Sequence, residues 1–205
     1  MFSQVESIKV NLPKWLEVFG QRYVASLKVE DRMQFVIEAA MKNIEMQTGG
    51  PFAAAVFELG SGKLISLGVN LVTTQGLSIL HAEILAISLA QRKLNTYDLD
   101  TSEEHAYELV TSTEPCAMCL GSIPWSGIRQ VVTGASDQDA RDIGFDEGPK
   151  PEDWVKALTT RGIYVVSHKL QSRARAVLKS YLKSKGEIYN SREASFESLP
   201  INKSE

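Results

Sequence analysis

His81-Ala82-Glu83 begins a run of good helix formers, and Pro115-Cys116-Ala117-Met118-Cys119 follows a short apolar run further along the chain. An imidazole and two thiolates are ligands that zinc prefers, and a two-residue spacer suits two cysteines that bind one ion. The chain has no other cysteines. A disulfide or a redox dithiol is the alternative for such a pair, but the histidine motif upstream favours a metal. We therefore predict one zinc ion held by His81, Cys116 and Cys119.

Three protein ligands would leave the fourth tetrahedral position of zinc open, which is the arrangement of catalytic rather than structural sites. No fourth ligand is evident, since His105 and His168 stand alone in the sequence. A water molecule in the open position would have its pKa lowered toward about 7. Glu83 lies two residues after His81, so on a helix it faces away from that ligand. We predict that Glu83 moves protons between the water and the substrate.

The overall composition is that of an ordinary globular protein. The 205 residues are 43% hydrophobic and 23% charged, enough for one well-filled domain. A formal charge of −3 and a pI near 5.7 argue against a polynucleotide as the main substrate, because phosphate binding leaves a basic surface. The chain has no 18-residue apolar run and no signal-peptide pattern, so we expect a cytoplasmic protein without membrane contact.

Apolar periodicity divides the chain into an N-terminal extension (1–29), one domain (30–190) and a polar tail (191–205). The extension has no regular pattern, but it could cover the core. Alternating helices and strands in the domain predict a three-layer α/β/α sandwich around a five-stranded mixed sheet. We expect polar loops at 73–78 and 144–149, helices at 31–46, 82–94, 115–124, 151–160 and 170–181, and strands at 52–58, 63–69, 107–111, 128–133 and 163–167.

The two metal motifs resemble those of the cytidine deaminase-like superfamily, in which H-x-E and P-C-x-x-C mark zinc-dependent base deaminases. Four further motifs resemble those of bacterial guanine deaminases more than those of cytidine deaminases. The resemblance runs from about residue 49 to 190. It implies a mixed five-stranded sheet between helices, one zinc ion per subunit, and a homodimer in which a C-terminal segment of one subunit closes the other's site. The further motifs are Gly49-Gly50-Pro51-Phe52, Asn70 with Val72-Thr73-Thr74, Glu114 through Gly121 and Gly144-Phe145-Asp146-Glu147.

The same resemblance implies roles for residues that do not bind the metal. Glu147 would read the substrate edge and take part in catalysis. Guanine presents N1–H and its 2-amino group side by side, two donors that one carboxylate can accept together. Some relatives have aspartate at this position, so the longer glutamate could alter the pocket. The remaining substrate-binding residues have different roles. Asn70 would hydrogen-bond the base, and Phe52 would pack on its ring. Ala82 and Trp125 would line the pocket, and Tyr189 would reach the partner's pocket.

These residues predict hydrolytic deamination of guanine to xanthine and ammonia. Guanosine, cytosine and aminotriazines such as ammeline remain alternative substrates of the same chemistry. A tRNA adenosine deaminase shares both metal motifs but would favour a basic surface. The basic residues of the last helix are either such a patch or a solvated face: Arg173, Arg175, Lys179, Lys183 and Lys185. A zinc ion that only stabilises the fold is the alternative without catalysis, and Glu83 argues against it.

Overall fold

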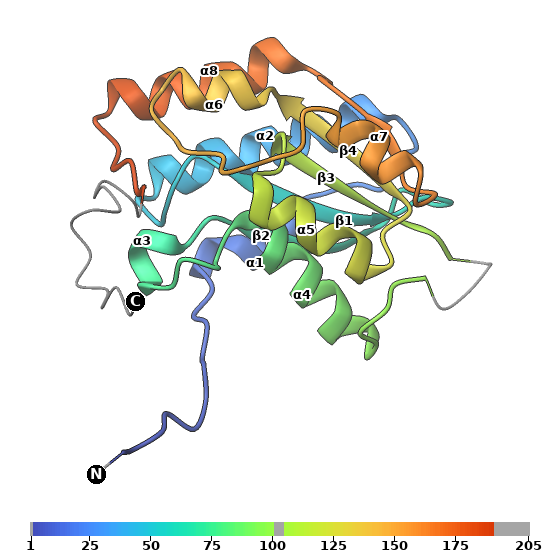
Figure 1. Cartoon of the computed structure of the whole chain (residues 1–205), viewed down its shortest axis with the longest axis horizontal. Coiled ribbons are helices and arrows are strands. Elements are labelled where there is room, and N and C mark those ends of the chain that lie inside the picture. The colour runs from blue at the N-terminus through green and yellow to red at the C-terminus, as the bar shows by residue number, and fades with distance from the viewer. Residues whose placement is uncertain (1, 101–104, 191–205) are drawn as a thin grey trace, which may run out of the picture.

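A computed structural model describes residues 2–100 and 105–190 of the chain (Figure 1). Five strands form one sheet in the order β2-β1-β3-β4-β5. Strand β1 (Ala53–Glu58) pairs antiparallel with β2 (Leu64–Val69) and β3 (Tyr107–Thr113). Strands β3, β4 (Gln130–Ala135) and β5 (Tyr164–Val166) run parallel. The sheet is therefore mixed and five-stranded, which confirms the predicted fold class.

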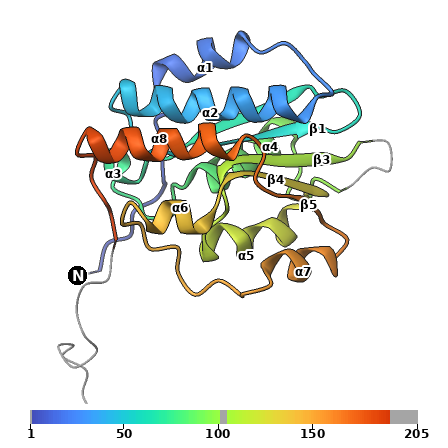
Figure 2. The ribbon, with the colours of Figure 1, turned by 90° about the horizontal axis from the view of Figure 1, so that it is seen from above.

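Helices cover both faces of this sheet (Figure 2). Alternate residues of β1 belong to different cores: Ala53, Ala55 and Phe57 to one, Ala54 and Val56 to the other. The first core packs beneath α1 (Lys14–Gln21), α2 (Val29–Glu45) and α8 (Gln171–Lys183). The second core packs against α4 (Ala82–Leu94), α5 (Ala117–Ser126) and α7 (Trp154–Thr159). None of the helices in the described ranges has the length and apolar character needed to cross a membrane.

The N-terminal segment contains a helix that we did not expect. We read residues 1–29 as irregular, but residues 14–21 form α1, whose Leu16 is buried in the first core. Phe19 stacks on Phe35 of α2 with ring centroids 5.0 Å apart. Eight residues are too few for a stable isolated helix, so tertiary packing stabilises this one. The segment does cover the core, while the division of the chain at residues 29 and 190 stays a prediction.

Two further short helices lie where we predicted no helix or strand. Helix α3 (Val72–Gln75) lies within the polar segment before His81, and α6 (Asp137–Arg141) follows β4. A capping box begins α6: the Ser136 side chain accepts from the Asp139 amide, and Asp139 accepts from the Ser136 amide. The Ser-x-x-Asp pattern at 136–139 therefore indicates the start of a helix, which apolar periodicity alone did not predict. The predicted polar tail, 191–205, lies outside the described residues.

Gly68 of β2 allows α4 to lie close to the sheet. A Cβ atom at this position would meet the Ala82 carbonyl oxygen at 2.4 Å and the Ala86 amide nitrogen at 2.6 Å. Both contacts are with backbone of α4, which cannot rotate away as a side chain can. Because His81 and Glu83 lie at the start of α4, the missing side chain of Gly68 also sets their distance from the sheet.

We predict that Gly68→Ala lowers the free energy of unfolding by about 1–3 kcal/mol, because overpacking displaces the first turns of α4. Urea unfolding of the zinc-loaded protein measures this change. Gly60→Ala is the matched control, since no atom lies within 4 Å of a Cβ at Gly60. Equal stability of Gly68→Ala and the unmodified chain would contradict the packing argument.

Candidate active site

The three predicted metal ligands lie at the beginnings of two helices. His81 occupies the cap position directly before α4, and Cys116 occupies the cap position of α5. Cys119 lies in the first turn of α5. We placed Pro115 within that first turn, but the helix begins two residues later, at Ala117. Free amide groups at a helix N-terminus carry partial positive charge, which favours the thiolate form of a nearby cysteine.

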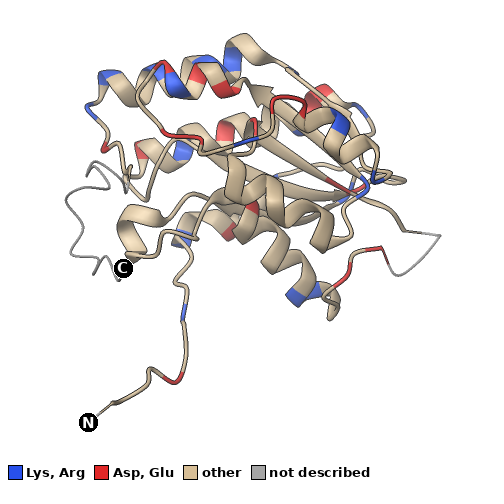
Figure 3. Cartoon of the chain, in the orientation of Figure 1, with Lys and Arg blue, Asp and Glu red and all other residues tan. Residues whose placement is uncertain are grey.

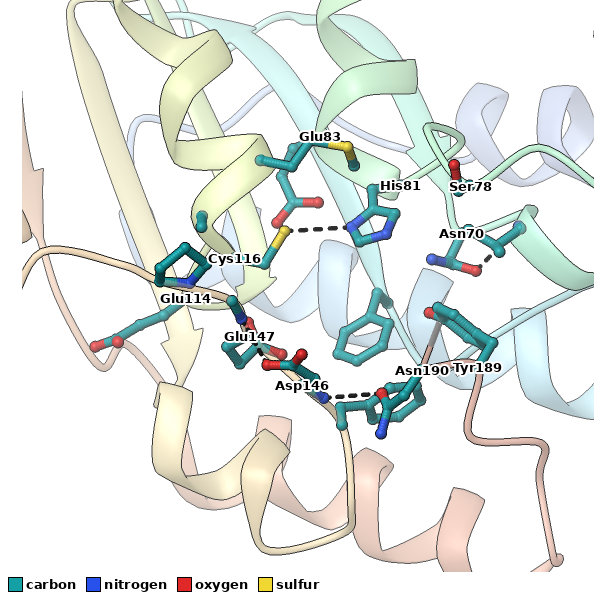
Figure 4. A pocket seen from close by; sticks show the side chains of 17 residues that line it. Asn70, Ser78, His81, Glu83, Glu114, Cys116, Asp146, Glu147, Tyr189 and Asn190 are labelled. Atoms are coloured by element: carbon teal, nitrogen blue, oxygen red, sulfur yellow. Dashed lines mark hydrogen bonds between the residues drawn. The ribbon is translucent and has the colours of Figure 1, made fainter. Parts of the chain in front are cut away.

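The ligand atoms have the spacing that one zinc ion requires. His81 Nδ1 lies 3.5 Å from Cys116 Sγ (Figure 4), and it lies 3.5 Å from Cys119 Sγ as well. All three ligand atoms lie within 4.8 Å of one another. Zinc–nitrogen and zinc–sulfur bonds at a tetrahedral angle place nitrogen and sulfur about 3.6 Å apart. The residues therefore fit a single zinc ion without rearrangement of the helices.

The protonation of the two thiols also suits a metal site. The hydrogen bond from Cys119 is the main cause that lowers the pKa of Cys116, to about 4. The pKa of Cys119 is raised well above its usual value, because Cys119 donates that hydrogen bond and is buried. A bound divalent cation favours the thiolate form of both residues. Within residues 2–100 and 105–190, no fourth ligand residue joins this group.

Glu83 lies beside the metal ligands without belonging to their group. Its Oε1 accepts a hydrogen bond from Thr111 Oγ1 at 3.1 Å, and its Oε2 lies 3.4 Å from Cys119 Sγ. Burial raises the pKa of this carboxyl. Thr111 is a neighbour that the sequence did not reveal, because it comes from the middle of β3 on a different part of the chain. The carboxylate is placed to reach a small molecule held at the metal.

A cavity of about 510 Å³ opens over the metal ligands. Four of the predicted substrate-binding residues line it: Phe52, Asn70, Glu147 and Tyr189. Phe52 meets the ring of Phe145 edge to face, with centroids 4.9 Å apart. Sequence reasoning gave no role to the remaining residues of the wall, although several of them lie within the motifs that carry the resemblance: Val72, Ser78, Glu114, Ala117, Met118, Phe145, Asp146, Gly148, Pro149 and Asn190.

Asn70 presents an unpaired amide donor to the cavity. The residue is fully buried, and its side-chain oxygen accepts from the Val72 amide at 3.2 Å. Its backbone carbonyl accepts a hydrogen bond from Asn43 Nδ2 at 2.9 Å, and this bond holds the Asn70 backbone in place. The Asn70 Nδ2 atom has no hydrogen-bond partner among the described residues. Buried donors without partners are costly, so this nitrogen marks a place for a ligand acceptor.

Glu147 places a second carboxyl in the cavity. Its side chain is buried, and its backbone carbonyl accepts from the Ala117 amide at 2.9 Å. Burial is the first cause that raises the pKa of Glu147 to about 8, and the negative charges of Cys116 and Asp137 add to it. The Asn70 amide and the Glu147 carboxyl, the two groups that we expected to hydrogen-bond the base, therefore line the same cavity.

Ala82 and Trp125 do not line the cavity, contrary to our expectation. Ala82, the first residue of α4, is fully buried in the second core. Trp125 is 85% exposed. Helix α5 buries Cys119, Leu120 and Ile123. A residue two positions beyond Ile123 on a helix faces away from that side, which explains the exposure of Trp125.

Tyr189 lies over the cavity of its own chain, whereas we expected it to reach a partner's pocket. Its ring centroid lies 6.4 Å from that of His81 and 5.0 Å from that of Phe145. The neighbouring Asn190 donates to the Gly144 carbonyl and accepts from the Asp146 amide. Residues 189–190 thus line one side of the cavity, next to the loop that carries Glu147 (Figure 4).

Comparison with known proteins agrees with this geometry. A model of the cytidine and deoxycytidylate deaminase zinc-binding region matches residues 27–135. The chain belongs to this zinc-binding deaminase family. Within the family it groups with the guanine deaminases. The guanine deaminase of Bacillus subtilis is 36% identical over 118 residues, which are 58% of this chain and 71% of that protein.

Solved structures extend the likeness over most of the chain. The guanine deaminase from Nitrosomonas europaea is 44% identical with a TM-score of 0.84, and the match covers 89% of this chain and 100% of that one. NE0047 in complex with 2,6-diaminopurine is 46% identical with a TM-score of 0.85, over 91% of this chain and 98% of that one. Relatives of another activity also match: the tRNA-specific adenosine deaminase of Haemophilus influenzae is 33% identical over 115 residues, which are 56% of this chain and 62% of that protein. The likeness to these solved structures therefore spans about nine tenths of the chain.

Proposed function

We propose that this chain deaminates guanine hydrolytically, giving xanthine and ammonia. The pairing of Glu147 with Asn70 beside the metal ligands carries the proposal. Guanine offers the Glu147 carboxylate two adjacent donors, N1–H and the 2-amino group, and it offers the Asn70 amide an acceptor on its ring. Two solved relatives agree with the proposal, since one is a guanine deaminase and the other is in complex with 2,6-diaminopurine.

The chemistry follows from the side chains around the bound ring. The zinc ion, when bound by His81, Cys116 and Cys119, supplies a Lewis acid that makes water nucleophilic near neutral pH. Glu83 takes a proton from the attacking water and delivers it to a ring nitrogen next to C2. The second proton goes to the 2-amino group, the C2–N bond breaks, and ammonia leaves. C2 keeps the oxygen as the new carbonyl of xanthine.

The charges of the cavity favour a neutral base over a phosphate-bearing substrate. Four carboxyl groups line it (Glu83, Glu114, Asp146 and Glu147), and the described lining contains no lysine or arginine. The basic residues of α8 lie on an outer helix of the molecule (Figure 3). Arg173 donates to Gln34, and Arg175 lies 3.7 Å from Asp139, as expected of a solvated face. A tRNA adenosine deaminase is therefore the weaker alternative.

The surface of α5 supports a homodimer. Met118 and Trp125 are 38% and 85% exposed and lie seven residues apart, so they occupy the same side of the helix. Met118 also lines the cavity, so a second copy of the chain packed on this side would cover the cavity rim. An exposed tryptophan in such a place is typical of the buried centre of an interface.

We predict that the full chain sediments as a dimer and that Trp125→Arg shifts it to the monomer, because a buried unpaired charge destabilises the interface. Tyr97→Arg is the matched control, since Tyr97 is 87% exposed but lies between α4 and β3. A monomeric unmodified chain would refute the interface, as would a dimer that survives Trp125→Arg.

A second prediction concerns substrate choice. Ammonia release from guanine, guanosine, cytosine, ammeline and tRNA ranks the substrates, and we expect guanine to be fastest. Glu147→Gln should lose about 2–4 kcal/mol of transition-state stabilisation for guanine, because a buried contact to two donors is broken. The loss should be much smaller for cytosine, which lacks that edge.

Two variants calibrate this measurement. Glu152→Gln, at an exposed position, should leave all rates unchanged. Glu83→Ala should keep its zinc yet lose turnover of every ring by about 100- to 10,000-fold, as expected for an acid–base group. Equal losses on all rings for Glu147→Gln would remove Glu147 from substrate recognition, and faster turnover of another ring would refute guanine as the substrate.

A further inference from the structure

Lys150 is an almost buried lysine at the end of the loop that carries Glu147. Its side chain is 7% exposed, which is rare for lysine unless its charge is paired. Its Nζ donates to Glu114 Oε2 at 3.2 Å and to the Pro115 carbonyl at 3.4 Å, and it lies 2.8 Å from Asp137 Oδ1. Three acceptors thus surround an ammonium group that has three N–H donors.

The acceptors of Lys150 belong to the segment that holds a metal ligand. Glu114 and Pro115 directly precede Cys116, so Lys150 fastens its own loop to the turn between β3 and α5. Glu114 is itself held in place, since it accepts from the Asp137 amide at 3.2 Å and pairs with His168 at 2.9 Å. Lys150 therefore contacts a rigid group of residues rather than a mobile surface.

Glu147 lies between two attachments to this turn. Its backbone carbonyl accepts from the Ala117 amide at 2.9 Å, one residue after Cys116. Three residues later, Lys150 holds the loop to the residues directly before Cys116. Between the attachments, Gly148 has a positive φ of 70° and donates to Asp146 Oδ1 at 2.9 Å. The two attachments fix the direction in which the Glu147 side chain leaves the loop.

We propose that Lys150 is a positioning residue, which acts through Glu147 by holding its carboxylate at a fixed distance from the Cys116 side of the metal site. The inference rests on the proposed role of Glu147 in binding guanine. Without the ammonium group, Glu114 and Asp137 would repel each other, and the loop end would move away from the turn. Glu147 would then meet the two donors of guanine with poor alignment, although its chemical group is unchanged.

A double-mutant cycle tests this role. Lys150→Met and Lys150→Arg are made in the full chain and in the Glu147→Gln variant, with Lys156→Met, an exposed lysine on α7, as the control. We expect Lys150→Met to lower kcat/KM for guanine about 10- to 100-fold and to weaken 8-azaguanine binding, with unchanged zinc content. Lys150→Arg should recover most of the loss, because the cation and its acceptors are kept. In the Glu147→Gln background, Lys150→Met should change little, since the aligned contact is already gone.

Additive losses in the two backgrounds would overturn the proposal, because they would mean that Lys150 acts only on stability or on the metal. A loss of zinc in Lys150→Met would overturn it as well, and so would an equal effect of Lys156→Met. If Lys150→Met does not fold, the same cycle run with Lys150→Arg must show a non-additive change of smaller size. An unmodified chain that releases no ammonia from guanine would refute the proposed function itself, whereas an active chain with additive variants refutes only the positioning role.

Discussion

The convergence of two helix N-termini on one point is the constraint on which the rest of the site depends. His81 before α4 and Cys116 and Cys119 at the start of α5 bring their ligand atoms within 4.8 Å of one another. This approach needs a close contact between α4 and β2, which Gly68 permits because it has no side chain. The positive ends of both helices favour a thiolate there, and the pKa of Cys116 is lowered, so the fold favours a charge that a zinc ion requires.

The cavity above this point brings carboxyl groups together with the residues that would hold one zinc ion. Four carboxyl groups line it, and burial raises the pKa of Glu147 to about 8 and that of Glu83 above its ordinary value. Among its described lining residues such a site offers no lysine or arginine to a phosphate, and it suits a neutral ring that donates hydrogen bonds. The loop that carries Glu147 needs firm support, because a misdirected carboxylate would lose both donors of the base. Ala117 and Lys150 supply that support from the turn that carries Cys116.

The sequence predicted the parts of this arrangement that depend on local patterns. The metal motifs and the longer helices and strands follow from spacing within short segments, and they appear in the structure as expected. Trp125 could not be placed from sequence, because its exposure depends on which side of α5 faces the sheet. The resemblance did not reveal that Tyr189 covers its own chain's cavity. Lys150 gave no signal either, since its acceptors come from residues 114, 115 and 137.

Zinc-edge X-ray absorption on the full chain, with and without 8-azaguanine, tests the central claim most directly. We predict one zinc ion per chain with one nitrogen and two sulfur ligands from the protein. The remaining ligand should be a solvent oxygen that responds when the analogue binds. A fourth protein ligand at the metal would contradict the account, as would a chain that binds no zinc.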